Sequence, residues 1–303
     1  MKPLTYKKNN LDEFRKIVIK AIFSNDELVN RFVLKGGSAL DLIYKITYRS
    51  SIDVDIAMED DIVEEDMPKI CELFQNALQE TFNEHDPSYS IFQFKFEKRP
   101  FKQNRINKQF WGGYRIEFKI RKGVYPIHDI KDQQQAARQA EVVNPESQSK
   151  TFLIDISKYE YTTLSKIKEL DYHQIRVYTL EMIVYEKLRA ICQKLPDYEH
   201  AHPKIKARPK DFYDIYMIMK HQPHITFESL ELSILEKFFN IKEVPLHLLF
   251  KISDYKTQVF DAGIDQLKET FLNNELKEFN QDEVFKFIID GIYKIPNIMT
   301  INN

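Results

Sequence analysis

The sequence predicts an α+β fold in which an α/β domain precedes a helical domain. Short alternating or apolar patterns typical of strands occur in residues 32–156, whereas long helical patterns fill the chain from about residue 179 onward. No internal repeat is visible, and 303 residues are enough for two domains of ordinary size. We therefore predict an α/β domain over residues 1–165 and a helical C-terminal domain over residues 166–303.

Composition indicates an ordered, globular protein. Apolar residues make up 43% of the chain and charged residues 30%, with only 7 glycines, which argues against fibrous and disordered classes. No run approaches the roughly 18 consecutive apolar residues that a membrane span needs. The first eight residues carry positive charge but precede no apolar run, so we expect no secretory signal, no membrane partner and a cytoplasmic location. Cys71 and Cys192 are expected to be reduced thiols without a catalytic role.

The first elements are predicted to be helical, followed by a strand, a glycine turn and a further helix. Helical spacing of apolar residues predicts one or two helices over residues 11–32, and the apolar run at residues 32–34 predicts a strand. Gly36-Gly37 allows a tight turn after that strand. Ser38 and Asp41 resemble a capping box, with Ser38 as the N-cap of the next helix and Asp41 reaching back.

Four more strands and one helix are predicted before the domain boundary. Strict alternation predicts the strands, and two of them flank a long basic connection as antiparallel neighbours. The strands are residues 51–57, 90–96, 114–120 and 151–156, and the helix is residues 67–82. Residues 131–150, rich in Gln and Ala, are predicted as a polar surface helix with a loop or as disordered chain, in either case without a core.

The second half of the chain is predicted to be helical. Apolar residues recur at helical spacing in five segments, and the chain beyond about residue 221 matches no motif. The five segments are residues 180–194, 209–220, 230–239, 246–260 and 282–293.

Asp53 and Asp55 carry the main prediction of a catalytic site. Alternate side chains of a strand share a face, so these two carboxylates point one way while Val54 and Ile56 point the other. Like charges held close together cost stability unless a cation or a donor neutralises them. Mg²⁺ favours one or two carboxylates, completed by phosphate oxygens and water. The alternative is an exposed edge strand whose aspartates simply face water.

A phosphate site is predicted at the glycine turn. Gly36 and Gly37 let the backbone approach a ligand closely, and Ser38 opens a helix whose amides attract anions. We therefore predict these three residues as nucleotide-binding. A phosphate cradle followed fifteen positions later by a metal-binding strand is a rarer coincidence than either feature alone. The alternative is a plain turn in which Ser38 serves only as a cap.

Charged residues lie on apolar faces of two predicted C-terminal helices. Lys187 falls on an apolar stripe, and a buried ammonium group needs a partner such as a triphosphate or a carboxylate. The helix from residue 209 is apolar nearly all round, yet carries Asp211 and Asp214. The alternative is an internal ion pair joining Asp211 to Lys187 or Arg208, without a substrate.

Charge is unevenly placed in a chain whose formal net charge is −2. Residues 53–66 hold eight acidic side chains and no Lys or Arg, whereas residues 95–122 hold ten basic and two acidic side chains, a balance of +8. The basic segment is interleaved with aromatic residues, a mixture suited to phosphate contact and base stacking. Alternatively, its aromatic residues belong to the core and its cations to a solvated face. The predicted RNA-binding residues are Lys98, Arg99, Lys102, Arg105 and Lys108.

Four segments in the same order resemble the AbiEii/AbiGii toxin family of nucleotidyltransferases. They are FVLKGGSAL at residues 32–40, RSSIDVD at 49–55, EKLRA at 186–190 and RPKDFYD at 208–214. The family is similar in its amino-terminal half to the polymerase-beta nucleotidyltransferase superfamily. The resemblance implies a nucleotidyltransferase-type mixed sheet with flanking helices, followed by a helical C-terminal domain that completes the active site. It also implies the toxin of a bacterial toxin–antitoxin or phage-defence module.

By position, the resemblance implies that Ser38 contacts phosphate and that Asp53 and Asp55 hold the metal. Lys187, helped by Arg208, would then meet the triphosphate, and Asp211 would complete the site. These roles correspond to metal-dependent transfer of a nucleotide from a nucleoside triphosphate, with Mg²⁺ or Mn²⁺ as the cofactor and pyrophosphate as the leaving group.

A third metal-binding and catalytic carboxylate is expected on a neighbouring strand. Asp155 is our choice, because it lies in an otherwise uncharged strand and could assist in deprotonating the acceptor hydroxyl. Glu117 is the competitor, but its strand face carries several cations, so a surface charge ladder explains it well.

RNA is the predicted acceptor, because some members of the family transfer nucleotides to the acceptor end of transfer RNA. A cognate antitoxin is a further candidate partner. One alternative is nucleotidyl transfer to a protein or small-molecule hydroxyl. The other is a non-catalytic protein that binds nucleotide, RNA or an antitoxin.

Overall fold

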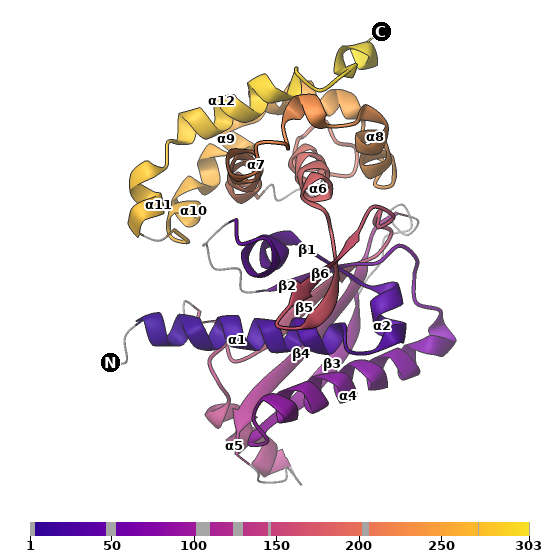
Figure 1. Cartoon of the computed structure of the whole chain (residues 1–303), viewed down its shortest axis with the longest axis vertical. Helices are drawn as coiled ribbons and strands as arrows, with labels where there is room; N and C mark the ends of the chain where they lie inside the picture. The colour runs from indigo at the N-terminus through magenta and orange to yellow at the C-terminus, as the bar shows by residue number, and fades with distance from the viewer. Residues whose placement is uncertain are drawn as a thin grey trace. The chain divides into compact units, whose positions relative to one another are not determined.

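The computed structural model describes residues 4–46, 53–100, 110–123, 130–144, 147–201, 206–271 and 273–302. The chain forms two compact units, which can be followed in Figure 1. The first unit comprises Met1–Ile43 and Ser51–Val177, and the second comprises Tyr44–Ser50 and Tyr178–Asn303.

One mixed sheet of seven strands, in the order β3-β4-β5-β2-β1-β7-β6, forms the centre of the first unit. Two strand pairs, β1 with β7 and β2 with β5, are parallel, and the other four pairs are antiparallel, including the predicted β3–β4 pair. The predicted α+β fold, a mixed sheet with flanking helices, is confirmed. The strands are β1 (Val33–Lys35), β2 (Val54–Ala57), β3 (Tyr89–Arg99), β4 (Gly113–Lys122), β5 (Phe152–Ser157), β6 (Lys166–Leu170) and β7 (His173–Val177).

The boundary between the units differs from the predicted one between residues 165 and 166. β6 and β7 form an antiparallel hairpin that belongs to the sheet, because β7 pairs with β1. Little in the sequence marks β6 as a strand, since four of its five residues are exposed and it has no apolar face. The first unit therefore extends to Val177.

Helices pack on the apolar face of the sheet. Phe82 of α4 lies 6.4 Å from Phe118 of β4, between ring centroids, and Phe74 lies 5.8 Å from Phe96 of β3. Phe14 of α1 packs on Phe82 in turn. Strand side chains alternate between faces, so the charged residues next to these apolar positions point away from α1 and α4. Besides the short helical segment after β1, the α-helices of this unit are α1 (Leu4–Ile22), α2 (Asp26–Arg31), α4 (Met67–His85) and α5 (Ile130–Gln139).

The segment after β1 differs from the predicted capping box. A short helical turn, α3 (Gly36–Ser38), begins at Gly36 and continues as a π-helix over Ala39–Ile43. Ser38 therefore lies inside the helical segment and is not its N-cap. The carboxylate of Asp41 accepts a hydrogen bond from Arg15.

The Gln-rich segment contributes to the core, against expectation. Ala136 of α5 and Ala140, which directly follows that helix, are buried, and they form a small apolar cluster with Phe92 of β3. The polar composition of the segment therefore still left two alanines that pack on Phe92. The prediction that residues 131–150 have no core was wrong.

The second unit is helical in its described part, as predicted. One segment differs in detail, because residues 246–260 form a 3₁₀-helix, Leu246–Tyr255, followed by a short α-helix. Leu249 and Ile252 are buried at the three-residue spacing of a 3₁₀-helix. The α-helices are α6 (Leu180–Cys192), α7 (Pro209–His221), α8 (Leu232–Asn240), α9 (Lys256–Val259), α10 (Ile264–Lys268), α11 (Asn273–Glu278) and α12 (Gln281–Ile292). Among all described residues, no helix is both long and apolar enough to cross a membrane.

Candidate active site

The glycine turn lies directly against one of the predicted metal ligands. β1 and β2 are antiparallel neighbours with Lys35 opposite Asp55, so Gly36 follows β1 next to that carboxylate. Gly36 has a φ of +67°, and a Cβ on it would lie 2.5 Å from Oδ2 of Asp55. This distance is well inside van der Waals contact, so glycine is the residue that allows the turn and the carboxylate to approach.

Asp53 and Asp55 form a pair of carboxylates on the face of the sheet opposite the helices α1 and α4. Asp53 precedes β2 by one residue, and residues two apart on an extended strand share a face. Both side chains are half-buried. Two hard oxygen ligands fit Mg²⁺, which binds proteins through one or two carboxylates and keeps positions for phosphate oxygens and water.

A larger protein-only metal cage is absent from the part of the chain that the structure describes. No group of three or more His, Cys, Asp or Glu side chains is arranged there to hold a metal ion.

Ser38 is buried and links the glycine turn to the carboxylate strand. Its Oγ donates a hydrogen bond to the main-chain carbonyl of Asp53 at 2.9 Å, and Nη1 of Arg15 lies 3.5 Å from the same Oγ. The predicted phosphate contact of this hydroxyl would compete with the bond to Asp53. In this structure, Ser38 joins two parts of the candidate site.

Asp155, the predicted third carboxylate, lies beside Asp55 in register on the parallel strand β5. Arg115 of β4 is opposite Asp155 and donates to both of its carboxylate oxygens, from Nε at 2.7 Å and from Nη2 at 3.2 Å. The hydrogen bond to Asp155 raises the pKa of Arg115, and burial opposes that rise. The structure thus brings Asp155 next to Asp55 and pairs its charge with Arg115.

Glu117 is placed farther along the same face. It lies opposite Leu153 of β5, and Nη2 of Arg99 donates to its Oε1 at 3.3 Å. This contact matches the surface charge ladder expected for that strand. Of the two rival carboxylates, Asp155 is the one in register with Asp55.

The basic segment is only partly described. Lys98 is exposed, whereas Arg99 contacts both Glu97 and Glu117. Lys102, Arg105 and Lys108 lie outside the described residues.

Most aromatic residues of this segment that the structure describes belong to the core. Phe110, Tyr114 and Phe118 are buried, as the alternative interpretation expected. Phe96 is half-buried and packs on Phe74, whereas 46% of the surface of Trp111 is exposed. Among these five aromatic residues, Trp111 is therefore the one that could stack on a base.

Three cations near the candidate site were missed in the sequence. Arg15 lies behind Ser38, Arg115 binds Asp155, and Lys35 forms a buried ion pair with Glu160 at 3.5 Å. Lys35 is the only charged residue of the short strand β1, and that signal was available from the sequence. Arg15 and Arg115 gave no such signal, because each is one of several charged residues on its element.

The second unit contains a buried cluster of charges on α6 and α7. Nζ of Lys187 lies 2.9 Å from Oδ1 of Asp211 and 2.7 Å from Oδ2 of Asp214, and Arg208 also donates to Asp211. Burial raises the pKa of Asp211, but Arg208 and Lys187 outweigh it and leave that pKa well below its usual value. The internal ion pair that the alternative interpretation expected is present.

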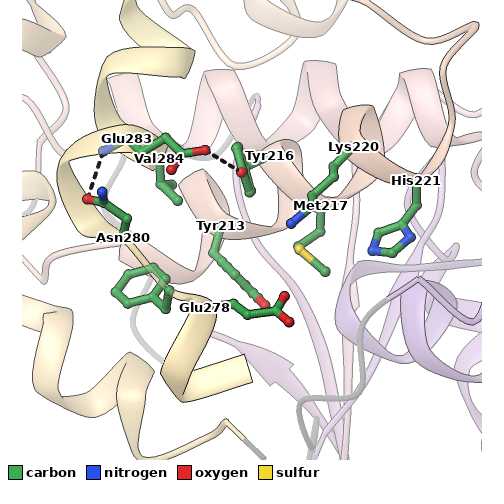
Figure 2. A pocket seen from close by; sticks show the side chains of 10 residues that line it. Tyr213, Tyr216, Met217, Lys220, His221, Glu278, Asn280, Glu283 and Val284 are labelled. Carbon is green, nitrogen blue, oxygen red and sulfur yellow. Dashed lines mark hydrogen bonds between the residues drawn. The ribbon is translucent and has the colours of Figure 1, made fainter. Parts of the chain in front are cut away.

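A small cavity of about 150 Å³ lies next to α7 and α12 and was not predicted. Figure 2 shows Tyr216 on one wall, donating to Oε1 of Glu283 at 2.7 Å. Burial, with the nearby Glu283 carboxylate, raises the pKa of Tyr216 to about 12. Small-molecule pockets usually measure about 300–1,000 Å³, so this cavity is too small for a nucleotide. Its other lining residues are Tyr213, Met217, Lys220, His221, Glu278, Phe279, Asn280 and Val284.

The mixed sheet, the glycine turn and the carboxylate pair match the nucleotidyltransferase-type fold that the four sequence motifs imply. The chain belongs to the AbiEii family of nucleotidyl transferase toxins from type IV toxin–antitoxin systems, whose model matches residues 17–291. None of the curated proteins matches the sequence.

Several solved structures are similar at low sequence identity. JHP933 from Helicobacter pylori is 15% identical, with a TM-score of 0.49, and the match covers 97% of this chain and 91% of that chain. The nucleotidyltransferase toxin MenT4 from Mycobacterium tuberculosis is 13% identical, with a TM-score of 0.41 and coverage of 98% and 92%. An antigenic nucleotidyltransferase-like protein from Paracoccidioides brasiliensis is 14% identical, with a TM-score of 0.33 and coverage of 82% and 94%.

Proposed function

We propose that the protein transfers a nucleotide from a nucleoside triphosphate to an RNA hydroxyl, at the acceptor end of transfer RNA, and releases pyrophosphate. The observation that carries the proposal is the Asp53–Asp55 pair, with Gly36 packed against the Asp55 carboxylate, in a chain of a nucleotidyl transferase family. Neither a structural turn nor a solvated strand requires a carboxylate and a glycine to approach this closely.

In the proposed reaction, the acceptor hydroxyl oxygen attacks the α-phosphorus of the triphosphate. A new oxygen–phosphorus bond forms, the bond between the α-phosphorus and the bridging oxygen breaks, and pyrophosphate leaves with that electron pair. Asp53 and Asp55 would hold Mg²⁺ or Mn²⁺, which neutralises charge on the phosphates. Asp155, held by Arg115, is proposed to complete the carboxylate set and to accept the hydroxyl proton.

The residues of the second unit keep their predicted roles as part of this proposal. Lys187 and Arg208 are proposed to offset charge on the β- and γ-phosphates, and Asp211 to hold both cations in place. Their contacts equally suit a structural clamp. The two roles separate in kinetics, because a triphosphate ligand affects KM for the nucleotide whereas a clamp affects the free energy of unfolding.

RNA is favoured as the acceptor by the +8 balance of residues 95–122. Lys98 and Trp111 are both exposed, which suits contact with phosphate and bases. If Lys102 and Arg105 bind RNA, changing both to Glu will weaken RNA binding and reduce its dependence on salt. Unchanged binding in that variant would place the RNA site elsewhere.

The proposed biological setting is a toxin that acts in the cytoplasm with a cognate antitoxin as partner. The family assignment supports this setting, since it describes a toxin–antitoxin system. A role in phage defence is part of the same proposal.

The test incubates the protein and Mg²⁺ with total transfer RNA and each α-labelled nucleoside triphosphate in turn. We expect label on RNA with the unmodified protein and none with Asp53→Ala. Label on protein or on a small molecule would change the proposed acceptor. No label anywhere, from folded protein that binds triphosphate, would favour a binding role and overturn the proposed transfer.

A further inference from the structure

Arg15 is a fully buried arginine on α1, directly behind the glycine turn. Its guanidinium donates to the carboxylates of Asp12 and Asp41, which neutralise its charge. Its Nε has no hydrogen-bond partner among the described residues. Burying a guanidinium whose Nε lacks a hydrogen bond costs free energy of folding. A group kept at such a cost commonly has a role other than stability.

The third contact of Arg15 connects it to the candidate site. Nη1 of Arg15 lies 3.5 Å from Oγ of Ser38, which is a long hydrogen bond. A donor on one side of a hydroxyl oxygen directs the hydroxyl proton to the other side. That proton lies toward the carbonyl of Asp53, to which Oγ of Ser38 donates at 2.9 Å.

The result is a chain of contacts that runs from α1 to the start of β2. Asp41 and Ser38 belong to the helical segment after Gly36, and Arg15 holds both of them. Ser38 in turn donates to the backbone of Asp53, which directly precedes β2, the strand that carries Asp55. All of these residues lie in the first unit.

We propose that Arg15 is a positioning residue that acts through Ser38 to fix the strand carrying Asp53 and Asp55 against the glycine turn. This inference rests on the proposed function for its catalytic consequence. Displacing a reacting group by about 1 Å costs on the order of a hundredfold in rate, so a residue with no contact to substrate has this effect on turnover.

Arginine suits the role better than lysine. Its planar fork donates in several fixed directions, and here it reaches Asp12, Asp41 and Ser38 at once. Lysine keeps the positive charge that pairs with the two carboxylates but lacks the planar guanidinium that donates in several fixed directions. Arg15→Lys therefore removes the contact to Ser38 while sparing charge balance.

The experiment compares Arg15→Lys, Ser38→Ala and the double variant with the unmodified full chain. The matched control is Arg176→Lys on β7, because Arg176 also donates to a serine, Ser165, and to a main-chain carbonyl. We measure kcat and KM for each labelled nucleotide, the melting temperature, and hydrogen exchange of the peptide covering residues 53–57.

We expect Arg15→Lys to lower kcat about tenfold or more with KM for the nucleotide nearly unchanged, and to speed exchange in residues 53–57. The double variant should lose no more kcat than Ser38→Ala, since both changes break one chain of contacts. Arg176→Lys should alter neither quantity. A multiplicative loss in the double variant would overturn action through Ser38.

Failure of the inference is distinguishable from failure of the proposed function. If the unmodified protein transfers nucleotide and Asp53→Ala does not, an unchanged kcat in Arg15→Lys overturns the positioning role alone. If neither the unmodified protein nor any variant transfers nucleotide, hydrogen exchange still tests whether Arg15 holds the strand. Exchange in residues 53–57 that is unaffected by Arg15→Lys would show that Arg15 does not hold this strand.

Discussion

Replacing Gly36 with alanine tests the geometry of the candidate active site. The new Cβ would lie 2.5 Å from Oδ2 of Asp55, and Gly36 has a φ of +67°. Alanine at this position would therefore strain the backbone and also displace the carboxylate of Asp55. We expect loss of stability and loss of nucleotidyl transfer from this single change.

The two effects differ in size. A non-glycine residue in the left-handed region costs ~1–2 kcal/mol, which corresponds to a fall of about 2–8 °C in the melting temperature. Restoring an ordinary contact of 3.4 Å requires Asp55 or the turn to move by about 0.9 Å. A displacement of about 1 Å at a reacting group lowers the rate on the order of a hundredfold.

Gly123→Ala is the matched control. Gly123 has a φ of +135°, but a Cβ on it would meet nothing within 4 Å, so it reports backbone strain without a clash. Urea unfolding gives the stability of both variants, and transfer of α-labelled nucleotide gives their rates. We expect both to be destabilised and only Gly36→Ala to lose transfer. Equal transfer rates for the two variants would refute the importance of the contact with Asp55.

Three further predictions concern the charged clusters. Lys187→Met leaves Asp211 and Asp214 without their shared cation and should lower the free energy of unfolding by roughly 3–5 kcal/mol. Adding Asp211→Asn and Asp214→Asn to Lys187→Met should restore part of that loss, whereas an unchanged urea midpoint for Lys187→Met would contradict a stabilising role of the ion pairs. Because the folded pKa of Asp211 is lowered, its stabilising contribution is present above the unfolded pKa of about 3.9 and is lost as pH falls below it. Asp211→Asn should therefore weaken the acid dependence of unfolding, and an identical pH profile would argue against this. Asp155→Asn keeps its shape beside Arg115 and should lower kcat about a hundredfold with a smaller change in KM, whereas wild-type kcat would remove Asp155 from the mechanism.

The sheet and its motifs were predictable from the sequence because each signal is local. Alternation over residues 90–96 and 114–120 identified β3 and β4, and an apolar run before Gly36 identified β1. The glycine turn was expected to let the backbone approach a phosphate ligand, whereas the group that the structure places against Gly36 is the carboxylate of Asp55. A short stretch of sequence therefore shows the periodicity of its secondary structure and the positions where glycine allows unusual backbone conformations.

What could not be predicted depends on contacts between distant residues. Arg15 and Ser38 are 23 positions apart, and Arg115 and Asp155 are 40 positions apart, so no spacing in the sequence relates them. The β6 strand was missed for a different reason. It lies at the edge of the sheet with four exposed residues, so burial imposes no apolar pattern on it.

In the second unit, burial of Lys187 shows that its ammonium group needs a partner, but not whether that partner is a carboxylate alone or also a triphosphate. An apolar helical face that carries Lys187 required a partner, and two kinds were considered from the sequence. The structure supplies Asp211 and Asp214 as that partner. A triphosphate would have to compete with them, which is why KM and unfolding free energy are the two quantities that separate the roles.

The most direct test of nucleotidyl transfer at the Asp53–Asp55 pair counts both products in one reaction. Pyrophosphate and labelled RNA are quantified for the unmodified protein, Asp53→Asn and Asp60→Asn, in which Asp60 serves as an exposed carboxylate from the same acidic segment. We predict equal amounts of the two products from the unmodified protein and Asp60→Asn, and a rate at least about a hundredfold lower from Asp53→Asn. Wild-type rates from a folded Asp53→Asn protein, or pyrophosphate without labelled acceptor, would contradict the account.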